Sequence, residues 1–307
     1  MEFDFFRIIS RRFFRIKTEA VGDISGTTVH PEASPVEWLN DWLPGNFFSI
    51  PSDESLSQNI FYQQGKIFGI DAASAAAVRA LSVEKKSVCL DLCCAPGGKL
   101  FLISELSSLA VGVDITEHRL FTTRAIARKY GIRNIRLFKA DGQTFSGANP
   151  GVNLFTESKK RKRDVKRESW DGFDRVLVDA ECTHDASLRH VKKQEKIHGT
   201  FNSPWEGKKS DLFDLQLRLL LNGFENLNAG GVLVYSTCSG DPGQNECVVR
   251  AFLAQTVNVV LDALPFGLDD CKATRVNIKD EDVICSCYFD PSCTGTSGLF
   301  ICRFRKL

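Results

Sequence analysis

This sequence of 307 residues lacks several features that would place it in a specialised class. No apolar run approaches the roughly 18 residues that span a membrane, so we expect no membrane partner. No two cysteines have the Cys-x-x-Cys spacing of structural zinc sites, and Cys285-x-Cys287 with Cys293 is a poor substitute, so we expect no metal. The net charge is only +1, so a nucleic acid would have to bind through local patches.

Two nucleotide-binding signatures are also missing. The turn at residues 91–99 is not a P-loop, because Cys93 stands at the position of its first glycine and Leu100 replaces the Ser or Thr after Lys99. The turn also fails the G-x-G-x-x-G pattern of dinucleotide-binding folds. This absence disfavours a nicotinamide-dependent oxidoreductase.

The chain has eleven cysteines, and an odd number in a chain of this length does not fit a disulfide framework. Several lie in apolar, strand-like runs, where a reduced thiol behaves as a small hydrophobic side chain. These are Cys89, Cys93, Cys94 and Cys302. We therefore expect a reducing, intracellular compartment, either nuclear or cytoplasmic.

Residues 1–17 mix phenylalanines with arginines, which is typical of an organellar presequence and leaves an organellar location open. Glu2 and Asp4 argue against a presequence, because transit peptides are poor in acids. We favour a first amphipathic helix that packs its phenylalanines on the domain.

From Ser87 onward, short apolar runs alternate with amphipathic stretches, which predicts an α/β fold with a mostly parallel sheet. We expect strands at 88–92, 110–113, 135–138, 175–178 and 232–235, and helices at 72–81, 100–106 and 117–130. Near-helical spacing of Leu212, Leu215, Leu219 and Leu227 predicts a further helix on the sheet. We divide the chain into an N-terminal extension (1–37), a small N-terminal module (38–84) and a catalytic domain (85–307).

Two stretches are rich in basic side chains. Seven of the nine residues at 159–167 are Lys or Arg, which fits a nuclear-import signal, a phosphate-contacting patch or a solvated loop. The second stretch, with His184, Arg189, His190, Lys192, Lys193, Lys196 and His198, is basic enough to contact phosphates or to form a solvated helix face.

Chemically useful side chains follow the predicted strands. The turn at 91–99 joins a strand to a helix, where backbone N–H groups and the helix N-terminus form a polar pocket. Asp114 and Asp141 end the next two strands, at positions where an acid can bind the hydroxyls of a ribose. Cys238 follows the apolar run Val232-Leu233-Val234, so it is a candidate catalytic thiol.

From Trp38 to Lys306, the order of these motifs resembles the Sun-type (NOL/NOP/Sun) family of RNA cytosine-C5 methyltransferases. The turn at 91–99 is similar to the family's S-adenosylmethionine loop, Val113-Asp114 to its ribose-binding strand end, and Ala140-Asp141 to its adenine-side acid. Asp179-Ala180-Glu181-Cys182 stands in the place of its Asp-x-Pro-Cys motif. Tyr235-Ser236-Thr237-Cys238-Ser239 resembles the motif with its nucleophile.

The resemblance implies a class I methyltransferase with a Rossmann-like fold that uses S-adenosylmethionine to methylate cytosine in tRNA or rRNA. Cys238 is implied as the thiolate that adds at C6, since C5 is too weak a nucleophile without that addition. Cys182 is implied to aid release, Asp179 to bind the base near N3 and N4, and Lys99 to orient this acid or the substrate. The implied cofactor residues are Cys93, Ala95, Pro96, Gly97, Gly98, Lys99, Asp114, Arg119, Asp141 and Asp179.

Glu181 departs from the family pattern, because the family has proline before this cysteine. The loop is therefore expected to be less rigid and to carry an extra acid beside the base. This departure leaves a second hypothesis open, a non-catalytic RNA-binding homologue that acts in RNA or ribosome assembly. The sequence names neither the RNA nor the oligomeric state.

Overall fold

The computed structural model of the chain describes residues 11–155, 168–187, 191, 203–279 and 283–307. Its larger sheet has nine strands in the order β11-β12-β13-β9-β8-β5-β6-β7, with β10 also paired to β13. The parallel strands are β5 Val88–Asp91, β6 Leu109–Asp114, β7 Ile135–Lys139, β8 Phe173–Asp179 and β9 Leu227–Thr237. The antiparallel strands are β10 Val259–Leu261, β11 Thr274–Arg275, β12 Ser286–Phe289 and β13 Leu299–Lys306.

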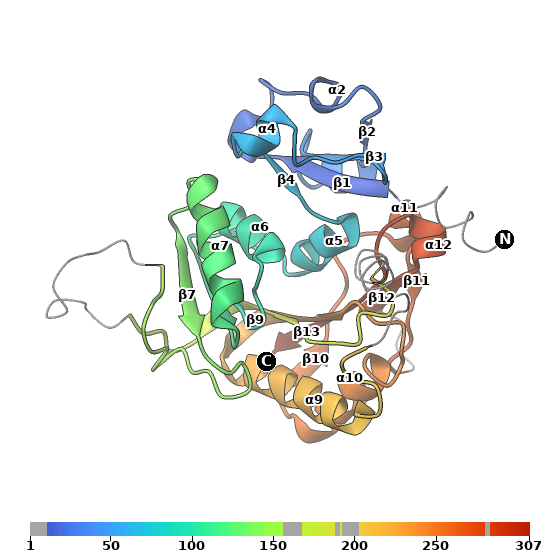
Figure 1. The fold of residues 1–307 in the computed structure, drawn as a ribbon. Coiled ribbons are helices and arrows are strands. Elements are labelled where there is room, and N and C mark those ends of the chain that lie inside the picture. Colours follow the sequence, from blue (N-terminus) through green and yellow to red (C-terminus); the bar gives the residue numbers. More distant parts are fainter. Residues whose placement is uncertain (1–10, 156–167, 188–190, 192–202, 280–282) are drawn as a thin grey trace, which may run out of the picture.

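Helices cover both faces of this sheet (Figure 1). One face carries α5 Ala72–Ala80, α6 Gly98–Leu106 and α7 Glu117–Lys129, and the other carries α9 Lys209–Glu225 and α10 Glu246–Gln255. Alternate strand residues enter the two layers, as Cys89 and Leu90 of β5 do, because successive side chains of a strand point to opposite faces. The predicted mostly parallel, Rossmann-like α/β fold is confirmed.

The predicted strands and helices of this domain are present, with ends shifted by one to a few residues, most at the β9 start. The leucine periodicity predicts α9, where Leu212 and Leu219 are buried, but Leu227 already belongs to β9. Gly131 has a φ of 66° just after α7, as a helix-terminating glycine should. No helix among the described residues is long and apolar enough to cross a membrane.

A second, four-stranded sheet forms the N-terminal module, in the order β2-β3-β1-β4. Its strands are β1 Arg11–Ile16, β2 Ser34–Pro35, β3 Phe47–Pro51 and β4 Ile67–Gly69. Short helical turns connect them: η1 Thr18–Ala20, α2 Gly26–Val29, α3 Glu37–Asn40 and α4 Ile60–Gln63. Because β1 and β2 pair with β3, the expected boundary after residue 37 passes through one sheet.

The predicted amphipathic helix at the N-terminus is wrong for the part that the structure describes, because residues 11–16 form β1. Phe14 and Ile16 enter the core of the module, whereas Phe13 and Arg15 face the larger domain. A strand bordered by packed groups on both sides buries consecutive residues, so its apolar pattern has no period of two. Residues 1–10 lie outside the described part.

The module is attached to α6 and α7 by polar contacts. The Arg15 guanidinium is 1% exposed and binds the Glu105 carboxylate at 2.6 Å. Lys17 Nζ donates to the Tyr130 carbonyl at 3.0 Å, and the Tyr130 hydroxyl donates to the Ile67 carbonyl at 2.9 Å. The Phe68 and Tyr130 rings stack with centroids 3.9 Å apart. The remaining short helices, α11 Leu268–Cys271 and α12 Pro291–Thr294, flank the antiparallel strands.

Candidate active site

A cavity of roughly 320 Å³ opens where the carboxyl ends of β5, β8 and β9 meet. Polar side chains gather there because parallel strands present their last residues at one edge of a sheet. Of the residues predicted from the sequence, those that line the cavity are Cys93, Ala95, Pro96, Gly98, Lys99, Arg119, Asp179 and Cys238. Gly97, Asp114, Asp141 and Cys182 are not among the residues that line the cavity.

The turn between β5 and α6 forms one wall. Gly97 has a φ of 106°, and a Cβ atom there would collide with the Phe101 ring, so the position requires glycine. Gly98 begins α6 next to the cavity, which directs the positive end of the helix dipole toward it. The Cys94 amide donates to the Val113 carbonyl at 2.9 Å, which ties the turn to β6.

Asp91, at the end of β5, is a buried acid in the cavity wall and is 1% exposed. Burial, and then the charge of Asp179, raises the pKa of Asp91 to about 8, although Lys99 opposes this shift. A carboxyl group in this position ionises readily only when a cation lies against it.

Asp114 and Asp141 cap the turns that follow their strands. The Asp114 carboxylate accepts hydrogen bonds from the amides of Ala95 at 3.2 Å and Thr116 at 2.8 Å. Arg119 lies 3.7 Å from Asp114. The Asp141 carboxylate accepts from the Gln143 amide at 2.9 Å. The predicted ribose and adenine contacts of these acids remain predictions.

Lys99 and Asp179 form a close ion pair between α6 and the end of β8. The lysine Nζ lies 2.7 Å from Asp179 Oδ2, and the Ser236 hydroxyl donates to Oδ1 at 2.7 Å. Burial disfavours the charge on Lys99, but the Asp179 carboxylate outweighs burial and raises the lysine pKa. The predicted orienting contact between Lys99 and this acid is therefore present in the structure.

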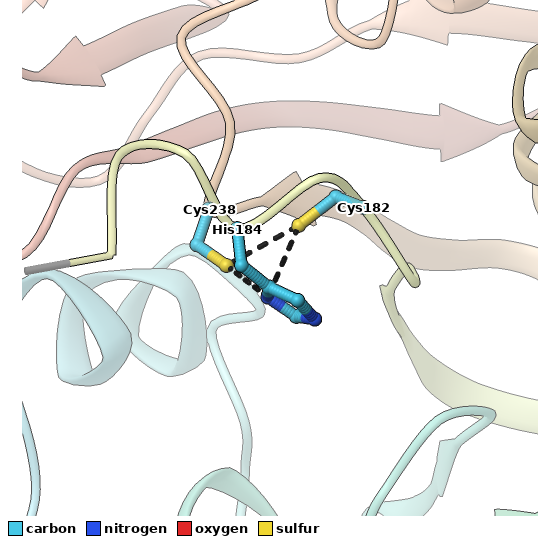
Figure 2. Close-up of side chains that lie close together, drawn as sticks. All are labelled: Cys182, His184 and Cys238. Carbon is cyan, nitrogen blue, oxygen red and sulfur yellow. Dashed lines mark hydrogen bonds between the residues drawn. The ribbon is translucent and has the colours of Figure 1, made fainter. Parts of the chain in front are cut away.

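Cys182 and Cys238 come from different strand ends and meet side by side (Figure 2). Their sulfur atoms are 3.2 Å apart. Cys182 is fully buried, whereas Cys238 reaches the cavity. The sequence places His184 only within a basic stretch, yet its imidazole contacts both sulfurs, with Nδ1 2.9 Å from Cys238 and 3.6 Å from Cys182.

The pKa shifts in this cluster favour one thiolate among the two sulfurs and a protonated imidazole, so a proton moves within the cluster and its number of protons stays the same. The hydrogen bond from Cys238, and the bonds from His184, lower the pKa of Cys182, while the hydrogen bond with Cys182 and burial raise the pKa of Cys238. Burial disfavours the imidazolium, but its bonds to Cys182 and Glu181 raise the pKa of His184 to about 10. Two thiols at this distance titrate as a unit, so the single negative charge belongs to the pair.

Among the described residues, one group of three side chains could hold a metal ion, and it consists of Cys182, His184 and Cys238. Around one tetrahedral zinc ion, two thiolate sulfurs would be about 3.8 Å apart and a sulfur and an imidazole nitrogen about 3.6 Å apart. The contacts of 3.2 and 2.9 Å are shorter than these, so they are the distances of hydrogen bonds.

The loop at 181–187 is held by many polar contacts. Gln216 Nε2 donates to the Glu181 carbonyl at 2.8 Å, and the Thr183 amide donates to Gln244 Oε1 at 3.0 Å. The Thr183 hydroxyl contacts the Ser239 hydroxyl at 3.0 Å. These bonds join the loop to α9 and to the segment after β9, so polar contacts restrain a loop that lacks proline at position 181.

The basic stretches lie mostly outside the described residues. Positions 159–167, 189, 190, 192, 193, 196 and 198 are among the residues that the structure does not describe. His184 is described, and its ring is directed at the two sulfurs. No periodic pattern in the sequence indicates this contact, because it depends on a left-handed residue in an irregular loop.

Comparisons with known proteins identify the family of the chain. A family model described as 16S rRNA methyltransferase RsmB/F matches residues 78–305. The 5-cytosine rRNA methyltransferase nsun-4 of Caenorhabditis elegans is 32% identical over 194 residues, which are 62% of this chain and 37% of that protein. The 28S rRNA (cytosine-C(5))-methyltransferase of Mus musculus is 27% identical over 87% of this chain and 31% of its own length.

A solved structure supports the fold. A methyltransferase homologue from Pyrococcus horikoshii aligns with a TM-score of 0.69 and 24% identity, over 97% of this chain and 87% of that one. The chain spans between about a third and a half of the curated relatives that it matches. The family match covers most of the chain, including both cysteines of the site and the turn before α6, and the chain therefore belongs to the RsmB/F family of methyltransferases.

Proposed function

We propose that this chain methylates C5 of cytosine in ribosomal RNA, through a covalent bond between Cys238 and C6 of the base, with Cys182 aiding release. The observation that supports this most strongly is the arrangement of two sulfurs 3.2 Å apart beside the Lys99–Asp179 ion pair. One buried cysteine has many structural explanations, but two in contact at the strand ends next to a charged pair fit a reaction that needs two thiols.

The cavity fits S-adenosylmethionine in size and charge. Its volume of roughly 320 Å³ is within the range of small-molecule pockets. Lys99 does not fully offset the burial of Asp91, so the pKa of this acid stays raised. The ammonium or sulfonium group of the cofactor would supply a further positive charge beside it. The turn at 93–98 and Arg119 would hold the remainder. When bound, the cofactor supplies the methyl group.

The side chains of the protein provide the other steps. The Cys238 thiolate adds to C6 of the base and moves electron density onto C5. Asp179, held by Lys99 and Ser236, hydrogen-bonds the ring and stabilises the charge that develops there. Cys182 lies beside the sulfur of the adduct and assists the elimination that frees the product.

Ribosomal RNA is the favoured substrate because the matching family model and the relatives above carry rRNA in their names. The target base must leave its stack to reach a sulfur at the wall of this cavity, so we expect base flipping.

The test of the reaction is transfer of labelled methyl from S-adenosylmethionine to total cellular RNA, followed by nucleoside analysis. Label in 5-methylcytidine of the rRNA fraction supports the proposal. Label in tRNA alone would change the substrate, and no label with intact cofactor binding would favour a non-catalytic role in RNA assembly.

The assignment of Cys182 has its own test. The Cys182→Ala variant should accumulate a covalent RNA adduct, because addition at C6 proceeds while release is slowed. A denaturing gel would show this adduct as a shifted protein band that disappears in the Cys182→Ala, Cys238→Ala double variant. The absence of the band from the single variant would contradict the two-cysteine assignment.

A further inference from the structure

Three side chains, Glu181, His184 and Cys238, form a continuous line of polar contacts at the cavity. We propose that His184 is a third catalytic group, which holds Cys238 as a thiolate, and that Glu181 positions its imidazole. This inference deepens the proposed function and rests on Cys238 being the nucleophile. The arrangement is an acid, an imidazole and a thiol in series, which is the general pattern of an activated nucleophile.

Both nitrogens of the imidazole are engaged, and in opposite directions. Nδ1 lies 2.9 Å from the sulfur of Cys238, and Nε2 lies 3.4 Å from Glu181 Oε1. The sulfur of Cys182 is farther from Nδ1, at 3.6 Å. The ring is therefore directed at the sulfur that reaches the cavity, with an acid behind it.

Glu181 is held in place as a charged group. Burial disfavours its ionisation, but His184, Arg119 and the Trp205 side chain outweigh burial and lower its pKa. Its backbone carbonyl accepts from Gln216 at 2.8 Å. A carboxylate that remains ionised beside Nε2 stabilises the protonated ring and fixes its orientation.

The backbone at His184 supports a functional role. Its φ is 58°, in the left-handed region that residues other than glycine seldom adopt. The neighbours maintain this conformation, since the Thr183 hydroxyl binds Asp185 Oδ1 at 2.5 Å and the Ser187 amide donates to the His184 carbonyl at 3.1 Å. Strained residues of this kind concentrate at functional sites.

The charges that face the imidazole favour its protonated form, because Cys182 and Glu181 raise the pKa of His184. Around Cys238, the Asp179 carboxylate disfavours the thiolate and Lys99, from α6, favours it. In the proposed step, the S–H bond of Cys238 breaks, the proton goes to Nδ1 of His184, and the electron pair remains on sulfur. In the elimination, the C5 proton goes to water, the C5–C6 double bond forms again and the C6–S bond breaks, so Cys238 returns as a thiolate that pairs again with the imidazolium.

This proposal gives the departure at position 181 a reason. Proline, which the Sun-type pattern has there, carries no acid, so it could not hold Nε2. Glutamate loses the rigidity of the proline ring, but Gln216 and Gln244 restrain the loop in its place.

The test measures the pH profile of Cys238 alkylation by iodoacetamide, read by mass spectrometry of the peptide that contains Cys238. His184→Asn is the best variant, because asparagine tolerates a positive φ. We expect His184→Asn to slow alkylation at pH 7 by about 30-fold and to move the profile to higher pH, and Glu181→Gln to have a smaller effect in the same direction. The series is repeated with Cys182→Ser, which removes the second sulfur.

The matched control is His30→Ala, because His30 also faces an acid, Glu54 at 3.8 Å, but lies in the N-terminal module. Its profile should match that of the unmodified chain. If the profile of His184→Asn also matches that of the unmodified chain, the proposal is wrong. If circular dichroism shows that His184→Asn does not fold, Glu181→Gln becomes the deciding variant, and an unchanged profile in Glu181→Gln would overturn the proposal. Alkylation needs neither RNA nor cofactor, so a chain that transfers no methyl group refutes the proposed function and leaves the role of His184 to be decided by the profiles.

Discussion

Two pairs of cysteines that are hydrogen-bonded to each other can be compared, and they lie in different surroundings. Cys182 and Cys238 meet at the cavity, whereas Cys285 and Cys302 are hydrogen-bonded to each other beside Phe300 and Phe304. Burial and then the contact with Cys285 raise the pKa of Cys302 well above its usual value. Contact between two thiols therefore does not activate either of them. The first pair differs by having His184 and Lys99 beside it.

The largest expected effect separates the two pairs directly. Cys238→Ala should abolish methyl transfer, with a loss of at least about 1,000-fold, because the addition at C6 has no substitute. Cys302→Ala should keep transfer within about threefold while lowering the free energy of unfolding by about 1 kcal/mol, as a small cavity does. Single-turnover assays with labelled cofactor, together with urea denaturation, measure both. Equal losses in the two variants would show that the comparison is mistaken.

The second prediction removes the lysine that only the first pair possesses. Lys99→Met should reduce methyl transfer by about 100-fold, because Asp179 loses its orienting partner and Cys238 loses a nearby cation. Lys86→Met is the control, since Lys86 is 88% exposed in a surface ion pair. The same single-turnover assay distinguishes them, and a loss in Lys86→Met of similar size would count against the specific role of Lys99.

The third prediction compares reactivity in the folded chain. At pH 7, iodoacetamide should label Cys238 at least about 10-fold faster than Cys302, because a thiolate and not a thiol is the nucleophile. Urea should remove this difference, since unfolding separates Cys238 from His184. Mass spectrometry of the labelled peptides gives both rates. Rapid labelling of Cys302 in the folded chain would mean that burial alone does not suppress a thiol here.

The smallest effect concerns stability. The folded pKa of His184, about 10, lies above the ordinary value of 6.5, so its contribution to stability is complete below pH 6.5 and is lost as the pH rises toward 10. The difference in unfolding free energy between the unmodified chain and His184→Asn should therefore shrink across this range. Urea denaturation at pH 6, 8 and 10 measures it. For Cys302→Ala the cost should change less between pH 6 and 8, since the high pKa of that thiol keeps it neutral there.

Much of the fold and part of the site could be predicted from the sequence. Short apolar runs separated by amphipathic stretches define βα units, and the last residue of each parallel strand lies at the ligand edge. For that reason the sequence predicts Asp179 and Cys238 at one edge of the sheet, and both line the same cavity in the structure. The turn before α6 was equally clear, because its glycines and proline break two regular elements.

The contacts of Glu181 and His184 could not be predicted in the same way. They depend on a left-handed residue within an irregular loop, and no periodicity reports such a conformation. The N-terminal strand was missed for a related reason. Arg15 is buried because Glu105, 90 residues later in the chain, neutralises it, and a local pattern carries no information about that partner.

The short distance between the sulfurs of Cys182 and Cys238 has a practical consequence for handling the protein. A peroxide would oxidise the thiolate of this pair to a sulfenic acid, and the neighbouring thiol would then displace water and form a disulfide. A preparation stored in air would lose the proposed nucleophile and the proposed release group in one event. Such a sample would look like a scaffold protein in every assay, so purification and storage under a thiol reductant decide whether the chain is recognised as an enzyme.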